Sequence, residues 1–250
     1  MLSGFYSIAS GLLAQQRNLD VIGNNLVNAQ TPGFRTDRMV FTTFEHELMM
    51  RREASHRAAI GTGSPITLVD DVITLHHSGL FEETGFAFDL AIDGPGFFTV
   101  EGPGGQVYLT RGGQFNMDAE GYLILADVGR VLGRDGNPVR VRNALFTVTE
   151  DGTVNSEAGR RIGNIAAVSP PTVEDLVSMD NGLYQLQDGA EAAPAAGFRM
   201  MQGVLERSNV DYNREMTTFI ETQRAFQACS TALQMIDGLN RRSVAQIASI

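Results

Sequence analysis

The chain has 250 residues, of which 43% are hydrophobic, so it can bury a core in one large or two modest folded units. Its formal net charge of −10 argues against nonspecific binding to nucleic acid or to an anionic membrane, since both attract positive surfaces. All 19 basic residues are arginine, which reflects either biased codon usage or the suitability of planar guanidinium groups for packed interfaces.

The cysteine count and the lengths of the apolar runs exclude further classes of protein. Cys229 is the single cysteine, so no disulfide can form within the chain. No run of about 18 apolar residues predicts a transmembrane helix. Residues 1–5 lack the basic residues that precede the apolar part of a cleaved secretory signal. These features alone indicate a cytosolic protein, but a protein exported without a cleaved signal would share them.

Residues 1–35 are predicted to form an N-terminal assembly helix that stops near Pro32. Apolar or small residues recur there at alternating steps of four and three, which is a heptad pattern. The interface residues that we expect from it are Phe5, Leu12, Leu19 and Leu26. Only Arg17 and Asp20 are charged before Asn28, whereas an ordinary surface helix has a charged face. Such a helix suits a position among other helices.

Glycines weaken this helix. Gly4 and Gly11 share a heptad position, and each costs about 1 kcal/mol relative to alanine. They either let a neighbouring backbone come close or simply loosen the end. Ordering one residue costs about 1–2 kcal/mol, whereas burying one large apolar side chain returns about 1.5–3 kcal/mol. Since fewer than half of these residues are large and apolar, we expect the helical ends to become ordered on assembly.

The middle of the chain differs in kind. Residues 36–79 are predicted to form a connecting segment with a short helix, because Thr42 and Glu45 have the spacing of a capping box ahead of Leu48 and Met49. Residues 80–190 are predicted to form an antiparallel β domain, since short β-like runs at 90–92, 96–100, 122–125 and 145–148 alternate with turn pairs. The turn pairs are Asp93-Gly94, Glu120-Gly121, Asp135-Gly136, Asp151-Gly152 and Asn181-Gly182.

The end of the chain becomes helical again. Residues 191–206, which begin rich in Ala and Pro, are predicted to be a linker, and residues 207–250 a C-terminal assembly helix that packs with residues 1–35. Its expected interface residues are Met216, Phe219, Phe226, Leu233 and Ile236. The predicted fold class is α+β. N- and C-terminal helices pair into a coiled-coil-like module, and an antiparallel β domain is inserted between them.

Signals for catalysis or metal binding are weak. Five residues loosely match a calcium loop, but their flanks read as strands, so we predict a hairpin turn. They are Asn116, Asp118, Glu120, Gly121 and Asp127. His76 and His77 would point to opposite faces of a strand. The spacings of a phosphate loop, a dinucleotide loop and a nucleophile elbow are missing. We therefore expect no enzyme activity, no cofactor, and no catalytic, cofactor-binding or metal-binding residues.

Several motifs resemble those of flagellar rod and hook proteins. The N-terminal signature of that family resembles SGLLAQQRNLDVIGNNLVN at residues 10–28 and TPGFR at 31–35. Its centre resembles residues 89–98, 109–115 and 118–123, and the lead into its C-terminal helix resembles GVLERSNVD at 203–211. The likeness spans nearly the whole chain. Gly23 and Val27 depart from it, because the family usually has alanine at both positions.

The resemblance implies a structural subunit of the bacterial flagellar basal-body rod, part of the drive shaft between membrane ring and hook. It implies polymerisation through the terminal helices, with the β domain outside the tube. Export through the flagellar type III apparatus, without a cleaved signal, would place the chain outside the cytoplasmic membrane in the periplasm or cell wall. The short segment 44–65 favours a proximal over a distal rod protein.

Partners follow from the same resemblance. The expected ones are other rod proteins, copies of this chain and the export apparatus, with hook and ring proteins as further candidates. No nucleic acid and no small-molecule substrate is expected. An alternative of another class is a β-domain module that binds cell-wall glycan or a flagellar ring protein.

Overall fold

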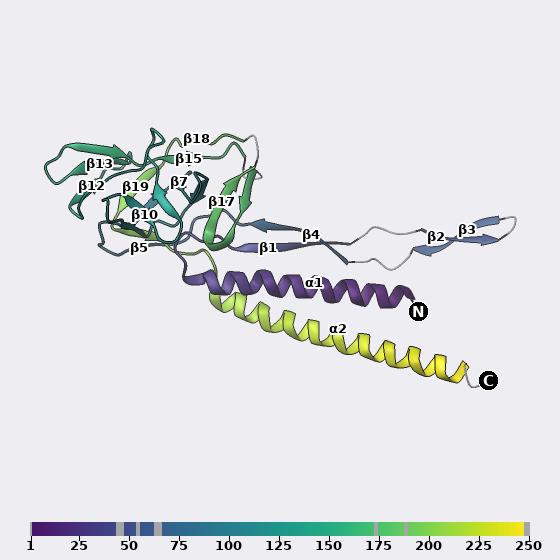
Figure 1. Ribbon diagram of the computed structural model, residues 1–250. Helices are drawn as coiled ribbons and strands as arrows, with labels where there is room; N and C mark the ends of the chain where they lie inside the picture. The colour runs from purple at the N-terminus through teal and green to yellow at the C-terminus, as the bar shows by residue number, and fades with distance from the viewer. Residues whose placement is uncertain are drawn as a thin grey trace. The chain divides into compact units, whose positions relative to one another are not determined.

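The computed structural model describes residues 2–43, 48–53, 56–62, 67–172, 175–187 and 190–247. The protein is an α+β chain with an N-terminal helix, a β-rich middle and a C-terminal helix, as Figure 1 shows. It divides into two compact units. Unit 1 combines Met1–Val27, Asp37–Leu75 and Asp211–Ile250, and unit 2 combines Asn28–Thr36 and His76–Val210. The prediction of the α+β class is confirmed.

Unit 1 contains both long helices and two antiparallel β-ribbons. The helices are α1 (Leu2–Val27) and α2 (Tyr212–Ile247). One ribbon pairs β1 (Asp37–Thr43) with β4 (Thr67–Thr74), and the other pairs β2 (Leu48–Glu53) with β3 (His56–Thr62). Within the described residues, neither α1 nor α2 combines the length and hydrophobicity of a membrane-spanning helix.

The prediction of a short helix between residues 36 and 79 is wrong for the residues of this segment that the structure describes. Thr42 lies in β1, and Leu48 and Met49 lie in β2. Glu45 lies outside the described residues. The β1 strand exchanges its backbone hydrogen bonds with β4, and that long-range pairing outweighs the local capping pattern.

Unit 2 is built mainly from short strands, and its described residues also include 3₁₀ turns. The turns are Asn28–Gln30 and Asp180–Gly182. The first strands are β5 (Phe81–Glu83), β6 (Leu90–Asp93), β7 (Phe97–Glu101), β8 (Val107–Thr110), β9 (Phe115–Met117), β10 (Leu123–Leu125) and β11 (Gly129–Val131). The later ones are β12 (Phe146–Val148), β13 (Thr153–Ser156), β14 (Arg161–Asn164), β15 (Ala167–Ser169), β16 (Leu176–Ser178), β17 (Leu183–Leu186), β18 (Ala193–Pro194), β19 (Arg199–Gln202) and β20 (Val204–Glu206).

The largest sheet of unit 2 has the strand order β16-β17-β8-β7-β11-β10-β9, with β15 joining β7 to β18. All pairings among the described strands are antiparallel, as predicted. Separate groups are β12-β13-β14, β19-β6 and β20-β5. The core contains Leu90, Phe98, Phe115, Leu123 and Val154, all nearly inaccessible to solvent. Burial of these side chains from several strands holds unit 2 together.

Turn chemistry explains where the strands end. The glycines of the five predicted turn pairs all have positive φ, which favours glycine over other residues. Of the five residues that loosely match a calcium loop, Asp118, Glu120 and Gly121 lie in the predicted hairpin turn between β9 and β10, in which the Gly121 N–H donates to the Asp118 carbonyl. Asn116 lies in β9, and Asp127 lies in the following turn between β10 and β11. Arg130 lies 2.8 Å from Asp118 and 2.9 Å from Glu120. Among the described residues no group of three or more His, Cys, Asp or Glu could hold a metal ion.

The segment predicted as a linker, residues 191–206, contains strands instead. It holds β18, β19 and β20, and Met200 of β19 belongs to the core of unit 2. The Ala/Pro-rich composition describes only its first half. The second half pairs with β6 and β5, which the sequence alone does not reveal because these strands lie more than a hundred residues earlier.

Candidate assembly surface

The helix α1 ends where the sequence has its stop signals. Asn28 begins a 3₁₀ turn, its side-chain oxygen accepts a hydrogen bond from the Thr31 hydroxyl at 3.2 Å, and Pro32 follows. The helix α2 begins with Asp211 as its N-cap. The Asp211 carboxylate accepts hydrogen bonds from the backbone N–H groups of Asn213 and Arg214, at 3.1 and 3.2 Å. This satisfies two of the donors left unpaired at a helix start.

The two helices contact each other and run antiparallel. The Asn18 amide donates to the Thr222 hydroxyl at 3.4 Å, and the Asn25 amide donates to the Glu215 carboxylate at 3.4 Å. The step is seven residues along each helix, so equivalent faces recur at heptad spacing. Figure 1 shows α1 and α2 running antiparallel within unit 1.

The predicted interface residues fall mostly on partly buried positions. On α1 these are Leu12, Leu19 and Leu26, and on α2 they are Phe219, Phe226, Leu233 and Ile236. Met216 is exposed, and the side chain of Phe5 lies outside what the structure describes. Among the helix side chains that the structure describes, the buried ones are instead Ala14, Ile22 and Asn25 on α1 and Thr222 on α2.

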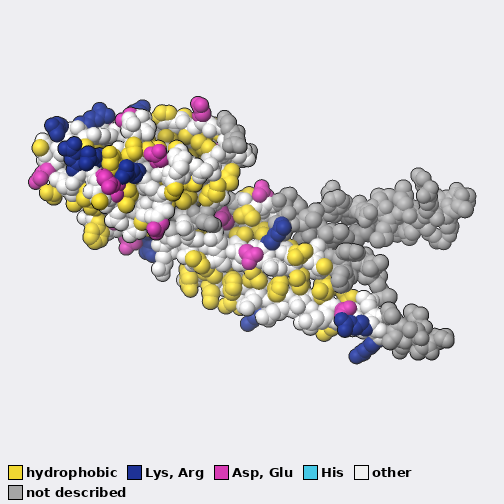
Figure 2. Space-filling model, in the orientation of Figure 1, with side chains coloured by type: hydrophobic (Ala, Val, Ile, Leu, Met, Phe, Trp, Pro, Cys, Tyr) yellow, Lys and Arg dark blue, Asp and Glu magenta, His cyan; other side chains and the backbone are white. Residues whose placement is uncertain are grey.

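A set of apolar side chains on the helices faces solvent, and we call it the apolar helix surface. It consists of Leu13, Val27, Tyr212, Met216, Ile220, Met235 and Leu239. Leu13 is 60% exposed and Val27 81%. Figure 2 shows yellow apolar side chains along the helices with few charged ones between them. Exposed apolar side chains that gather on one element mark sites of protein–protein contact.

Sequence reasoning missed most of this surface. The heptad pattern selected Leu12 and Leu26, whereas the exposed residues Leu13 and Val27 are each one position further along. The signal that does point to them is the scarcity of charge, because α1 has only Arg17 and Asp20 for its exposed face. Apolar residues also face solvent on the β1–β4 ribbon, at Phe41, Val72 and Ile73.

Asn25 fixes the start of this ribbon against α1. Its side chain exchanges two hydrogen bonds with the backbone of Asp37, at 2.7 and 2.9 Å, in the manner of a strand pair. The Thr74 hydroxyl donates to the Asp37 carboxylate at 2.6 Å. Burial raises the pKa of Asp37, and the bond from Thr74 opposes that shift.

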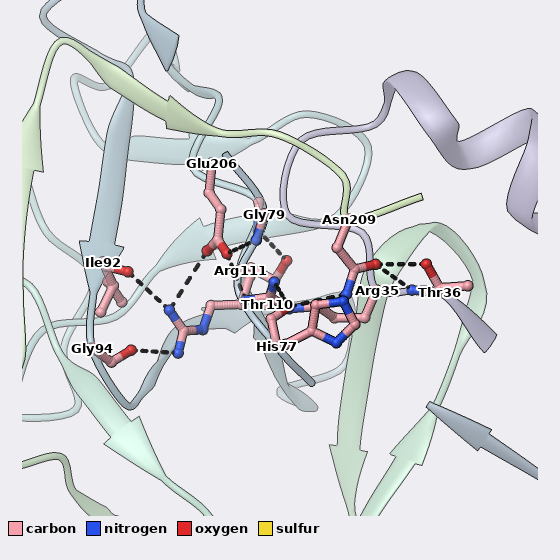
Figure 3. Close-up of polar contacts among 11 residues, drawn as sticks. Arg35, Thr36, His77, Gly79, Ile92, Gly94, Thr110, Arg111, Glu206 and Asn209 are labelled. Atoms are coloured by element: carbon pink, nitrogen blue, oxygen red, sulfur yellow. Dashed lines mark hydrogen bonds and ion pairs between the residues drawn. The ribbon is translucent and has the colours of Figure 1, made fainter. Parts of the chain in front are cut away.

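A polar cluster in unit 2 joins the segments that lead to and from the helices, and we call it the junction cluster. Its buried members are Arg35, Arg111 and Glu206; the half-buried Asn209 and the backbone carbonyl of the exposed His77 complete it, as Figure 3 shows. Arg35 and Glu206 form an almost fully buried ion pair of 2.6 Å. The Gly79 N–H donates to the same carboxylate at 3.0 Å, and Arg35 also donates to the His77 carbonyl.

The other two members extend the junction cluster on both sides. Asn209 accepts two bonds of 2.7 Å from the backbone and hydroxyl of Thr36, and it donates to the His77 carbonyl at 2.9 Å. Arg111 lies 3.6 Å from Glu206 and donates to the carbonyls of Ile92 and Gly94. Burial lowers the pKa of Arg111, while Glu206 opposes that shift. Removing one partner of a buried pair leaves an unpaired buried charge and costs about 3–5 kcal/mol, so we expect the folded junction to need both Arg35 and Glu206.

His76 lies beside this cluster without joining it. Its ring is 5.7 Å from the Tyr184 ring and 6.4 Å from the Phe97 ring. Burial lowers the pKa of His76, and the positive charges of Arg35 and Arg111 lower it further. The neutral ring is therefore the form that the fold favours.

The fold and the apolar helix surface define an α+β chain with a candidate assembly surface on its terminal helices. Three family models match it. "Flagella basal body rod protein" matches residues 5–35, "Flagellar hook protein FlgE/F/G D1 domain" residues 91–183, and "Flagellar basal body rod FlgEFG protein C-terminal" residues 201–247. These segments cover α1, most of unit 2 and α2.

Whole proteins match over the same span. The flagellar basal-body rod protein FlgF of Caulobacter vibrioides is 32% identical, with 100% of both chains covered. The rod protein FlgG of Bacillus subtilis is 32% identical over 95% of this chain and 96% of its own length. FlgG of Agrobacterium fabrum is 30% identical over 92% and 93%. The chain therefore belongs to the flagellar basal-body rod protein family.

Proposed function

We propose that the chain is a structural subunit of the bacterial flagellar basal-body rod, which polymerises through its terminal helices. The apolar helix surface is the observation that carries this proposal. Fully burying a leucine or valine side chain contributes about 1.5–3 kcal/mol, so contact with neighbouring subunits would make α1 and α2 more stable. The names of the relatives support a rod protein and do not favour the alternative of a glycan-binding or ring-binding module.

The two helices would act as one assembly module, residues 1–35 with 207–250, paired as an antiparallel coiled coil. The bonds Asn18–Thr222 and Asn25–Glu215, seven residues apart, support this pairing. Partly buried residues such as Leu19 and Phe226 would line the contact between α1 and α2. Exposed residues such as Leu13 and Met235 would then meet other subunits, so the module would carry two apolar faces.

Location and partners belong to the same proposal. The subunit would act in the basal body outside the cytoplasmic membrane, after export by the flagellar type III apparatus without signal cleavage. Copies of itself and other rod proteins would be its partners, with hook and ring proteins at the ends. The short segment 44–65 supports a proximal position. The role is structural rather than enzymatic.

Two charged substitutions test the assembly surface. Leu13→Asp and Val27→Asp place a carboxylate at exposed positions, so the monomer keeps its fold. Burying that unpaired charge between subunits costs several kcal/mol, and each 1.4 kcal/mol is a factor of about ten. We expect the amount of chain in purified basal bodies to fall at least about tenfold, with loss of swimming.

Leu145→Asp is the matched control. Leu145 is 58% exposed in unit 2, against 60% for Leu13, and the substitution is the same. It should enter basal bodies at the level of the unaltered chain. Equal incorporation of Leu13→Asp and this control would contradict assembly through the helices, and absence of the unaltered chain from basal bodies would contradict the rod function itself.

A further inference from the structure

Unit 2 has a groove lined by arginines. The groove has a volume of about 490 Å³ and lies between the segment 135–143 and the hairpin that ends in β14. Its lining includes Arg140, Arg142, Arg160 and Arg161. An adjoining hollow of about 520 Å³ shares Arg161 and adds Arg134. Figure 2 shows arginine side chains gathered over the end of unit 2 that holds β12 and β13.

These arginines have few carboxylates to neutralise them. Within the described ranges, the side chains of Arg134, Arg142, Arg160 and Arg161 make no ion pair and no hydrogen bond. Arg140 donates to the Glu120 carbonyl at 2.8 Å rather than to a carboxylate. Asp135 is the acidic residue among those lining the groove, and its carboxylate accepts hydrogen bonds from Asn137. The groove therefore has a surplus of positive charge.

The rest of the molecule has the opposite charge. The whole chain carries −10, so the residues other than these five arginines together carry −15. Arg142 also has φ of 66°, a left-handed conformation that is unfavourable for a residue with a side chain. Its side chain is exposed, so burial does not compensate for this strain. Strained residues cluster at functional sites, and paired guanidinium groups are suited to binding carboxylates in a bidentate way.

An acidic edge strand of the same chain has the complementary chemistry. All three residues of β5 are exposed, and the strand carries Glu82 and Glu83. Glu82 forms a solvent-exposed ion pair of 3.5 Å with Arg207, which contributes little in water and leaves the carboxylate accessible. Among the described strands it pairs with β20 alone, so its other edge is open. Leu80 is 79% exposed and Phe86 is 71% exposed, so apolar side chains flank the two carboxylates. Pro138, Val139 and Ile162 of the groove offer apolar contacts between the arginines.

We propose that the arginine groove of one copy binds the acidic strand β5 of a second copy through Glu82 and Glu83. The two surfaces differ, so the contact is heterologous and continues from copy to copy, as an open helical polymer requires. This contact between β domains would exist in addition to the contact between helices. It would fix the register of neighbouring copies, since charge complementarity sets register and partner choice. This inference rests on the proposed rod function.

A charge swap in the full chain tests the contact. One variant carries Arg160→Glu with Arg161→Glu, a second carries Glu82→Arg with Glu83→Arg, and a third carries all four substitutions. Incorporation into purified basal bodies should fall on the order of tenfold in each of the first two, because like charges then face each other. The third variant should regain most of the lost incorporation, since its charges are complementary again.

Stability and a control separate this contact from a folding defect. Thermal unfolding of purified Arg160→Glu/Arg161→Glu should be unchanged or shifted to higher temperature, because the substitution relieves repulsion within the groove. Arg199→Glu reverses an exposed arginine that lies 3.6 Å from Asp93, outside the groove, and should incorporate normally. Failure of the four-substitution chain to recover, or normal incorporation of both charge-reversed chains, would overturn this inference alone. Absence of the unaltered chain from basal bodies would instead overturn the rod function.

Discussion

Gly33 explains why the turn after α1 needs glycine. Its φ is 73°, and a Cβ there would lie 2.2 Å from the backbone carbon of Arg111. Its N–H donates to the Glu206 carbonyl at 2.8 Å. A larger residue would force the turn away from the strand end that carries Arg111, and with it the junction cluster. The stop signal at Pro32 and Gly33 was readable from the sequence, but the close contact was not, because Arg111 and Glu206 approach only in the fold.

The pKa of His76 predicts a pH dependence of stability. The folded state holds this pKa below its ordinary value of about 6.5, so at slightly acidic pH the unfolded chain binds more protons than the folded one. The stability contributed by neutral His76 is present above that value and is lost as the pH falls below it. The charged groups around the ring are Arg35 and Arg111, both positive, so a protonated ring finds no compensation there.

His76→Phe should therefore reduce the acid sensitivity of unit 2. Phenylalanine keeps the ring contacts with Phe97 and Tyr184 but cannot titrate. Thermal unfolding of the two proteins between about pH 7.5 and 5.5 measures the difference, and the melting temperature of the native chain should drop more steeply. Parallel curves for the two proteins would show that His76 does not contribute to the pH dependence.

At the scale of elements, the glycines of α1 lower the stability of the helix in the monomer without any packing need within the monomer. A Cβ at Gly11 or Gly23 would meet nothing within 4 Å, so neither the fold of the monomer nor the contact with α2 requires glycine there. Glycine in a helix nevertheless costs about 1 kcal/mol relative to alanine. When another subunit packs its backbone against this face, the close contact offsets that cost in the assembled rod, whereas nothing offsets it in the monomer.

Gly11→Ala is expected to stabilise α1 in the free chain by up to about 1 kcal/mol while it lowers incorporation into basal bodies. Circular dichroism during thermal unfolding checks the first effect, and the amount of chain in basal bodies checks the second. A variant that is more stable and also assembles normally would favour the other interpretation of these glycines, in which they merely loosen the helix end.

The elements show which patterns the sequence can reveal. Strands β6, β7, β10 and β12 were predicted because each lies next to a turn pair whose glycine needs positive φ, which is a local signal. Both helices were predicted from their period. The β1–β4 ribbon and β19 were not, since each depends on a partner strand far along the chain. Most of the apolar helix surface does not follow from the sequence, because heptad spacing does not show which neighbouring residue turns toward α2.

At the scale of the whole molecule, burial is unevenly divided. In the described part of the chain, the main core of unit 2 contains fourteen buried hydrophobic residues. Of the helix side chains whose burial the structure describes, the buried ones are Ala14, Ile22, Asn25 and Thr222, and Ile22 is the large apolar one among them. Burial of one such side chain returns about 1.5–3 kcal/mol, whereas ordering each residue of a helix costs about 1–2 kcal/mol. The helices of a free copy are therefore held much more weakly than unit 2.

We expect amide hydrogen exchange on a dilute chain to show this difference directly. Backbone amides of β7, β8 and β10 should be strongly protected, and those of α1 and α2 should be only weakly protected. Sedimentation at the same concentration serves as the control that the sample is monomeric. Strong protection at Leu12, Leu19, Phe226 and Leu233 in such a monomer would mean that the helices are stable without neighbours. Their exposed apolar surface would then be available for premature polymerisation, and ordering of the ends could not be what limits assembly to the growing rod.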